Sequence, residues 1–359
     1  MKKILLVITL ALFNFSLQSQ EKSKIIEVDV KKSTSFSLSQ IVEEITMVTL
    51  SKPNNLSLYK ISKILLIDNF LYVLSGSEEN KGFPEYVLQF DLKGNFIKEL
   101  DRKNKETGEL MEVTGLFYSD DKIYVRYKNK HKKYAVFNSQ GDFEYSKNNN
   151  DSFICAFNNG LWNENVSFDF DKGIAIHTVE KRNRTTNKVK TILKYKENLK
   201  PKFIKNKIKG SILADYSVTD NKLFIAVDHT KTVYIMDNEN KMSAFQFNLK
   251  NNSPSTFSIK PLSCGLNNYI KFGYMSGTTP YIYLYNIKDN TGNNIKISWG
   301  KNRKLISGIQ DDILNTGFVN LRNTNVKELG YFTKRKYDLP EIFNESDDSD
   351  SVVFIVKLK

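Results

Sequence analysis

The sequence predicts an all-β fold, a six-bladed β-propeller, and three observations support this prediction. Of the 359 residues, 12% are aromatic and 40% are hydrophobic, which is enough to build a buried core. Short strand-like runs recur at intervals of about 50 residues, and no long amphipathic helix lies between them. A chain of this length exceeds the size at which a single compact core stops growing, so a ring of repeats suits it. A pair of β-sandwich domains is the alternative, but the even spacing of the runs favours the propeller.

The first 19 residues predict a secretory signal peptide. Lys2 and Lys3 precede an apolar stretch from Ile4 to Phe15, and the cleavage site is expected between Ser19 and Gln20. The stretch is shorter than the about 20 residues that a membrane-spanning helix needs. The alternative is a buried N-terminal helix, but no polar face alternates with the apolar one. We therefore expect export to the periplasm or the exterior, without a lipid anchor because no cysteine lies near the cleavage site. Residues 20–359 then form one propeller domain.

Two segments near the ends of the mature chain are expected to close the ring. Ser37 to Gln40 match a capping box, which predicts one short helix from about residue 38 to 44. A strand-like run from 44 to 50 follows it, and Val352 to Val356 form the last such run of the chain. Because a closed propeller leaves no open edge between its first and last sheets, we expect these two runs to share a sheet, with Met47 and Phe354 together in it.

The repeat is visible in the spacing of four equivalent positions. Tyr72, Tyr124, Ile174 and Phe224 follow one another at steps of 52, 50 and 50 residues. Most runs are followed by a second apolar strand and a turn containing Gly or Asn, which supply the positive φ that tight hairpins require. The expected blades cover residues 58–105, 111–149, 152–206, 211–249, 256–298 and 304–359, the last one completed by 44–50.

The positive charge of the chain is concentrated in one segment. The formal net charge is +13, and once the signal peptide is removed 51 basic residues face 40 acidic ones. Residues 181–209 hold twelve basic residues and one acid, Glu197, so this segment carries the whole excess. Its candidate residues are Lys181, Arg182, Arg184, Lys188, Lys190, Lys194 and Lys196.

Two interpretations of this basic segment remain open. Val189, Thr191, Leu193 and Tyr195 alternate with lysines, which is typical of a strand with one buried and one solvated face. Lysines at such an edge also discourage aggregation. Alternatively, the segment faces an anionic partner such as an acidic glycan or lipid head groups. Export argues against nucleic acid as that partner.

No residue pattern predicts a catalytic centre, a cofactor or a metal site. The three histidines, His131, His177 and His229, lie in a basic hairpin or out of register with each other, and a satisfied or solvent-facing role suits them better than metal ligation. The acids at 169–171 and 347–350 lack the spacing of a calcium loop and are expected in turns. Cys155 and Cys264 are expected to be small buried side chains, because one blade separates them.

Several motifs together resemble a known family. They are Ile61-Ser62-Lys63-Ile64, Leu88 to Phe96, the segment from Leu38 to Leu50, and the ending Val352 to Lys359. The whole mature chain is similar to the exported six-bladed β-propellers of Bacteroidetes, which are grouped with TolB-like and NHL-like propellers. Two departures are present: only Gly108-Glu109 remains of the family's Gly-rich stretch, and Ser349-Asp350-Ser351 replaces its Asp-Asn-Pro. The resemblance implies the fold and export but no particular activity.

These observations favour a non-catalytic scaffold over an enzyme. We expect a monomeric exported propeller that binds a protein or glycan partner in the cell envelope through its loops. The alternative is a metal-assisted hydrolase or lyase with its site at the mouth of the central channel.

Overall fold

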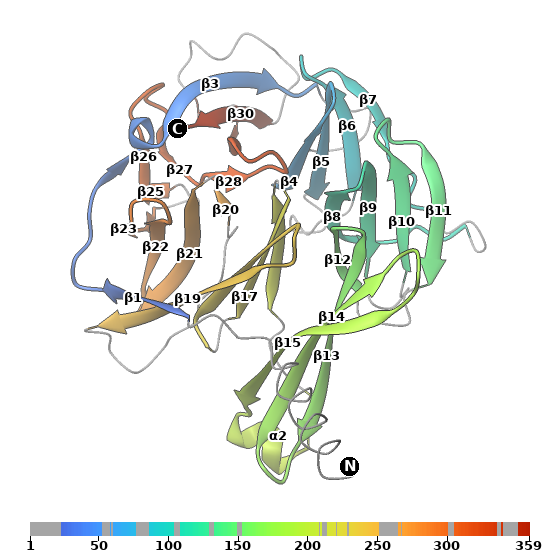
Figure 1. Cartoon of the computed structure of the whole chain (residues 1–359). Coiled ribbons are helices and arrows are strands. Elements are labelled where there is room, and N and C mark those ends of the chain that lie inside the picture. The colour runs from blue at the N-terminus through green and yellow to red at the C-terminus, as the bar shows by residue number, and fades with distance from the viewer. Residues whose placement is uncertain are drawn as a thin grey trace, which may run out of the picture.

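The structure is a computed structural model in which the strands form a ring of sheets (Figure 1). It describes residues 23–51, 58, 60–76, 86–103, 108–128, 133–148, 153–207, 209, 214–219, 221–227, 230–250, 265–266, 268–300, 305–335, 339 and 351–359. The predicted signal peptide lies outside the described residues. Among the residues described, no helix is long and apolar enough to cross a membrane.

The strands build a β-propeller, and the blades are numbered here in chain order. Blade one contains β4 (Lys60–Ile67), β5 (Phe70–Gly76), β6 (Tyr86–Asp91) and β7 (Phe96–Glu99). Blade two contains β8 (Val113–Ser119), β9 (Lys122–Tyr127), β10 (Lys133–Asn138) and β11 (Phe143–Asn148). Blade three contains β12 (Phe153–Phe157), β13 (Gly160–Asp169), β14 (Ile174–Asn183) and β15 (Val189–Asn198). Blade four contains β16 (Asp215–Thr219), β17 (Lys222–Val227), β18 (Thr232–Asp237), β19 (Met242–Lys250) and β1 (Lys24–Asp29).

The remaining blades complete the ring. Blade five contains β20 (Gly265–Leu266), β21 (Tyr269–Ser276), β22 (Thr279–Asn286) and β23 (Thr291–Lys296). Blade six contains β2 (Phe36–Ser37), β26 (Ile309–Asp311) and β27 (Gly317–Val319), with the ribbon of β24 (Ser298–Trp299) and β25 (Leu305–Ser307) beside it. Blade seven contains β28 (Arg322–Asn323), β29 (Leu329–Arg335), β30 (Ser351–Leu358) and β3 (Val42–Thr49).

The predicted number of blades, six, is wrong, because the structure has seven. The region 304–359, expected to be one blade, contains strands of both blade six and blade seven. The extra blade escaped the repeat pattern for a physical reason: β26 and β27 have only 3 residues each, too few to show an alternating pattern. Its third strand, β2, comes from near the N-terminus and pairs with β26 in parallel.

In several blades a two-residue turn joins the first and second strands into a hairpin. Asp68, Asp120 and Asn158 open three of these hairpins with φ angles of 51°, 52° and 49°. Asp and Asn tolerate this left-handed conformation, which tight hairpins require. In blade three the hairpin leads into β13, so Ile174 belongs to the third strand and not to the equivalent second strand. The position that corresponds to Tyr72 there is Trp162, and the even spacing of the predicted repeat was therefore wrong at this blade.

The ring is closed as predicted. β3 pairs antiparallel with β30, and Met47 lies opposite Phe354 in the register. The capping box is also confirmed, since the side chain of Gln40 accepts a hydrogen bond from the backbone of Ser37 at 3.3 Å. The helix it begins is only the 3₁₀ turn η1 (Leu38–Gln40), because β3 starts at Val42. A second short helix, α2 (Pro201–Lys205), was not predicted.

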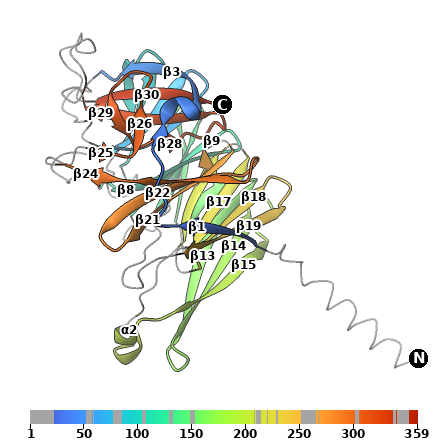
Figure 2. The same ribbon diagram turned by 90° about the vertical axis from the view of Figure 1, so that its left-hand side faces the viewer.

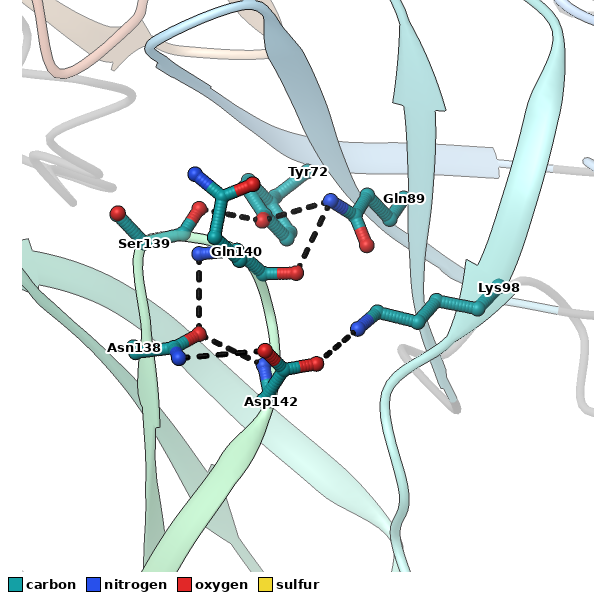
Figure 3. Close-up of polar contacts among 7 residues, drawn as sticks. All are labelled: Tyr72, Gln89, Lys98, Asn138, Ser139, Gln140 and Asp142. Atoms are coloured by element: carbon teal, nitrogen blue, oxygen red, sulfur yellow. Dashed lines mark hydrogen bonds and ion pairs between the residues drawn. The ribbon is translucent and has the colours of Figure 1, made fainter.

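Neighbouring blades are joined through the tips of their hairpins, and Figure 3 shows the junction of blades one and two. The hydroxyl of Tyr72 donates to the backbone oxygen of Ser139 at 2.7 Å, and the amide of Gln89 donates to Tyr72 at 2.9 Å. At the rim, the ammonium group of Lys98 pairs with Asp142 at 2.7 Å. Burial of Tyr72 and the negative charge of Asp142 raise the pKa of the tyrosine, which therefore stays a hydrogen-bond donor.

Candidate functional site

Blade three differs from the other blades in the length of its strands. β13, β14 and β15 have 10 residues each, and β13 and β14 pair continuously from Gly160 opposite Asn183 to Asp169 opposite Ile174. Figures 1 and 2 show these strands and α2 projecting beyond the ring. We call β13, β14, β15 and α2 the blade-three extension. It carries all seven basic candidate residues on β14, β15 or the turn between them.

Two of the basic candidates point into the protein and have partners. The ammonium group of Lys181 donates to the side chain of Asn240 at 3.1 Å and lies 5.9 Å from the ring centre of Trp162. Arg184 forms an ion pair with Asp120 and lies 5.5 Å from the ring centre of Tyr124. These residues hold blade three against blades two and four. Arg182, which lies between them in the sequence, is half-buried.

Four basic candidates are exposed: Lys188, Lys190, Lys194 and Lys196. Lys190, Lys194 and Lys196 lie on β15, which is the outer strand of its sheet and, among the described strands, pairs with β14 alone. Leu193 and Tyr195 are buried between the lysines, so the predicted alternation is confirmed in this half of the strand. It fails at Val189 and Thr191, which are exposed because both faces of that end of β15 lie in solvent.

A buried polar cluster lies at the base of the extension, centred on Glu164 and His177. The Nδ1 atom of His177 lies 2.6 Å from Glu164, and its Nε2 atom lies 3.1 Å from Glu197. The carboxylate of Glu164 also accepts hydrogen bonds from the hydroxyl of Tyr216 at 2.7 Å and from the hydroxyl of Tyr195. We call Glu164, His177, Tyr195, Glu197 and Tyr216 the His177 cluster.

The surroundings of His177 favour the charged form of its ring. Both ring nitrogens lie within hydrogen-bonding distance of a carboxylate, and only the imidazolium form donates from both. Burial lowers the pKa of His177, but the hydrogen bonds to Glu164 and Glu197 outweigh this effect, so the pKa is raised above its ordinary value. The prediction of a satisfied histidine is confirmed. His131 and His229 lie outside the described residues.

Sequence reasoning missed the partners of His177. With His177 itself, the members of the cluster come from four strands, β13 to β16. Tyr216 and the backbone N–H of Ala214, which donates to Glu164 at 3.1 Å, belong to the start of blade four. The signal in the sequence was weak: Glu197 is the single acid of the basic segment. The cluster therefore ties the extension to blade four.

Near the axis of the ring, two basic side chains converge on one aromatic ring. The ammonium group of Lys63 on β4 lies 4.8 Å from the ring centre of Phe117 on β8. The guanidinium carbon of Arg126 on β9 lies 5.8 Å from the same ring centre. β4, β8 and β12 are the first strands of blades one, two and three and contact one another in turn. We call Lys63, Phe117 and Arg126 the axial basic cluster.

In a second basic pair, Lys271 and Arg322, both side chains donate hydrogen bonds to protein oxygens. Lys271 donates to the side chain of Asn320 at 2.9 Å and to the backbone oxygen of Leu321. Arg322 donates to the backbone oxygen of Ile61 at 2.7 Å and so joins blade seven to blade one. Burial lowers the pKa of Lys271 to about 7.

The remaining predicted sites fall into turns, the core or undescribed parts of the chain. Asp169 accepts a hydrogen bond from the backbone of Lys172 at 3.1 Å and pairs with its ammonium group at 2.9 Å, which confirms a turn acid. Cys155 is buried as predicted, and burial raises the pKa of its thiol to about 12. Cys264, the acids at 347–350, and Ser19 and Gln20 lie outside the described residues. In the part of the chain that the structure describes, no group of three His, Cys, Asp or Glu side chains could hold a metal ion.

Comparison with solved structures places the chain among the β-propellers. A protein of Bacteroides fragilis described as exported matches 94% of this chain and 100% of its own length, with a TM-score of 0.64 and 14% identity. At this identity the likeness shows the fold alone. Virginiamycin B lyase from Staphylococcus aureus is 11% identical, covers 87% of this chain and 99% of its own, and has a TM-score of 0.40. TolB from Acinetobacter baumannii is 12% identical, covers 80% and 63%, and also has a TM-score of 0.40, so neither protein carries an argument. No protein-family model and no curated protein matches the chain.

Proposed function

We propose that this chain is an exported, non-catalytic β-propeller scaffold that binds a protein or glycan partner in the cell envelope. Export rests on the signal peptide expected over residues 1–19, and the propeller shared with an exported protein of Bacteroides fragilis is consistent with it. The observation that carries the proposal is the blade-three extension. Strands of 10 residues project beyond the ring and present lysines that no core packing requires.

The chemistry of the extension favours an acidic partner. Lys188, Lys190, Lys194 and Lys196 are exposed, and Lys194 and Lys196 point to the same side of β15 because side chains two apart share a face. One exposed ion pair contributes only about 0–1 kcal/mol, so useful affinity needs several pairs at once. Binding of this kind weakens with salt, since the Debye length falls from about 10 Å at 0.1 M to about 3 Å at 1 M.

The test is a charge reversal with a matched control of equal net charge. Lys190→Glu, Lys194→Glu and Lys196→Glu are combined in one variant of the mature protein. The control reverses Lys31, Lys93 and Lys288, which are exposed elsewhere. Binding to polygalacturonate and, separately, to poly-glutamate is titrated calorimetrically at several salt concentrations.

We expect the β15 variant to lose about tenfold or more in affinity for one of the two polyanions, and the control to stay within about twofold of wild type. The polyanion that responds tells a glycan partner from an acidic protein partner. Equal losses in both variants would show that only net charge matters, and would reject the extension as the binding surface.

A further inference from the structure

The axial basic cluster has an unusual charge environment. Within the described part of the chain, Arg126 donates from its guanidinium group to neutral oxygens: the side chain and backbone of Thr114, each at 3.2 Å, and the backbone oxygen of Ile154 at 3.3 Å. Lys63 has no hydrogen-bond acceptor and no acidic partner among the residues that the structure describes. Both side chains are half-buried, and the buried thiol of Cys155, whose pKa is raised to about 12, interacts electrostatically with both of them. In the described ranges, no acidic side chain balances their charges.

This arrangement is costly unless something compensates for it. Bringing a cation out of water without a partner is unfavourable, and a second cation nearby adds repulsion. Burial lowers the pKa of Lys63 to about 8, and the charge of Arg126 lowers it as well. The cation–π contact of Lys63 with Phe117 offsets this cost by only about 0.5–2 kcal/mol of stabilisation.

Comparison with the other buried lysine of the ring sharpens the contrast. Lys271 donates to two acceptors, Asn320 and Leu321, so the fold itself satisfies its ammonium group. Lys63 lies on the first strand of its blade and Lys271 on the second strand of its blade, and Lys63 has no such acceptors among the residues described. A fold that satisfies one buried lysine and not the other leaves the second available for a ligand.

Local geometry packs Arg126 closely against Phe117. Gly115 lies opposite Arg126 in the β8–β9 register, and a Cβ atom there would lie 2.8 Å from the Phe117 ring and 3.2 Å from Nε of Arg126. The glycine lets the ring and the guanidinium group pack directly on β8. Phe117 then lies between the two cations' strands, with Lys63 approaching its ring from blade one and Arg126 from blade two.

We propose that Lys63 and Arg126 together bind an oxyanion, a carboxylate or phosphate group of a small ligand, near the axis of the propeller between blades one and two. The guanidinium N–H groups that Thr114 and Ile154 leave unused orient the oxyanion, and the ammonium group supplies a further charge-assisted hydrogen bond. The ligand contributes the negative charge that the described protein residues lack. This site is separate from the lysines of the blade-three extension.

The test titrates the mature protein with inorganic phosphate and, in a second arm, with galacturonate, at constant ionic strength. Saturable binding is measured calorimetrically in wild type, in Lys63→Met and in Lys60→Met. Lys60 is an exposed lysine on the same strand and serves as the matched control. Thermal unfolding of each protein is recorded without ligand, because removal of an unbalanced charge should leave the stability of Lys63→Met equal to or above that of wild type.

We expect one saturable site in wild type and Lys60→Met, and an affinity about tenfold or more lower in Lys63→Met. Galacturonate keeps its negative charge between pH 6.5 and pH 9.5, whereas Lys63, with a pKa of about 8, loses its proton in this range. The affinity of the protein for galacturonate should therefore fall about tenfold from pH 6.5 to pH 9.5. Response to only one of the two anions identifies the chemical source of the oxyanion. Absence of saturable binding to both anions, or binding that Lys63→Met leaves unchanged, would overturn the proposal.

Discussion

Replacement of Glu164 by glutamine tests the role of the His177 cluster in holding the extension. The carboxylate accepts hydrogen bonds from His177 at 2.6 Å, from the backbone of Ala214 at 3.1 Å, and from the hydroxyls of Tyr195 and Tyr216. Glutamine keeps the shape but removes the charge, and its NH₂ group faces donors where acceptors are needed. An unsatisfied buried donor costs about 1–3 kcal/mol.

The expected loss of unfolding free energy for Glu164→Gln is about 3–5 kcal/mol, the usual cost of removing one partner from a buried ion pair. With an unfolding entropy of about 2.1 cal/mol/K per residue over roughly 340 mature residues, this corresponds to a fall in Tm of about 4–7 °C. Urea unfolding and calorimetry measure both quantities. Hydrogen exchange at the amide of Ala214 gives a local readout, because that N–H loses its acceptor.

The matched control is Glu180→Gln in the same blade. Glu180 accepts a hydrogen bond from the exposed side chain of Asn165 at 2.9 Å, so its replacement should change stability by less than about 0.5 kcal/mol. A loss below about 1 kcal/mol in Glu164→Gln, or a loss equal to that of the control, would refute the argument that this carboxylate anchors the extension.

Three further predictions follow from other contacts. The pKa of His177 is raised above its ordinary value of about 6.5, so its stabilisation is complete below about pH 6.5 and is lost as the pH rises through the folded pKa. Urea unfolding should show wild-type stability falling by up to about 1.4 kcal/mol per pH unit in that window and no such fall in His177→Gln; equal slopes would contradict this. Gly94 and Gly108 both have positive φ, but only at Gly94 would an added Cβ atom lie 2.1 Å from a backbone oxygen, that of Thr49. Urea unfolding should therefore show that Gly94→Ala lowers the free energy of unfolding by about 1–3 kcal/mol more than Gly108→Ala does. Asn294 donates to the backbone oxygens of Asp29, the last residue of β1, and of Lys32, at 3.2 and 3.0 Å. Asn294→Ala should therefore speed tryptic cleavage after Lys31 and Lys32, and an unchanged rate would count against this anchor.

The local parts of the fold were predictable from the sequence because they depend on neighbouring residues. The turn from Asp91 to Asn95 forms because the side chain of Asp91 accepts hydrogen bonds from the backbone of Lys93 at 2.9 Å and of Asn95 at 2.8 Å. The closing pair of β3 and β30 was predictable as well, since a ring needs its ends joined. These features follow from residue type and from the rule that sheet edges must be covered.

The errors have different origins. β1 and β2 pair in parallel with β19 and β26, strands more than 200 residues away, and no local pattern reports such pairing. Blade three was placed out of register because β13 and β14 are longer than the strands of the other blades, which shifted the spacing. The number of blades was wrong for a separate reason, the shortness of β26 and β27 in blade six.

The sequence alone determined that the fold is all-β and built of repeated hairpins, that one segment is strongly basic, and that the last strand pairs with a strand near the N-terminus. Only the tertiary structure decided that there are seven blades, that Glu164 and Glu197 enclose His177, and that Lys63 and Arg126 converge on Phe117. The physical reason is that turns and alternation are set by residues a few positions apart. A charge is balanced or left unbalanced by side chains from other blades, which become neighbours only when the ring closes.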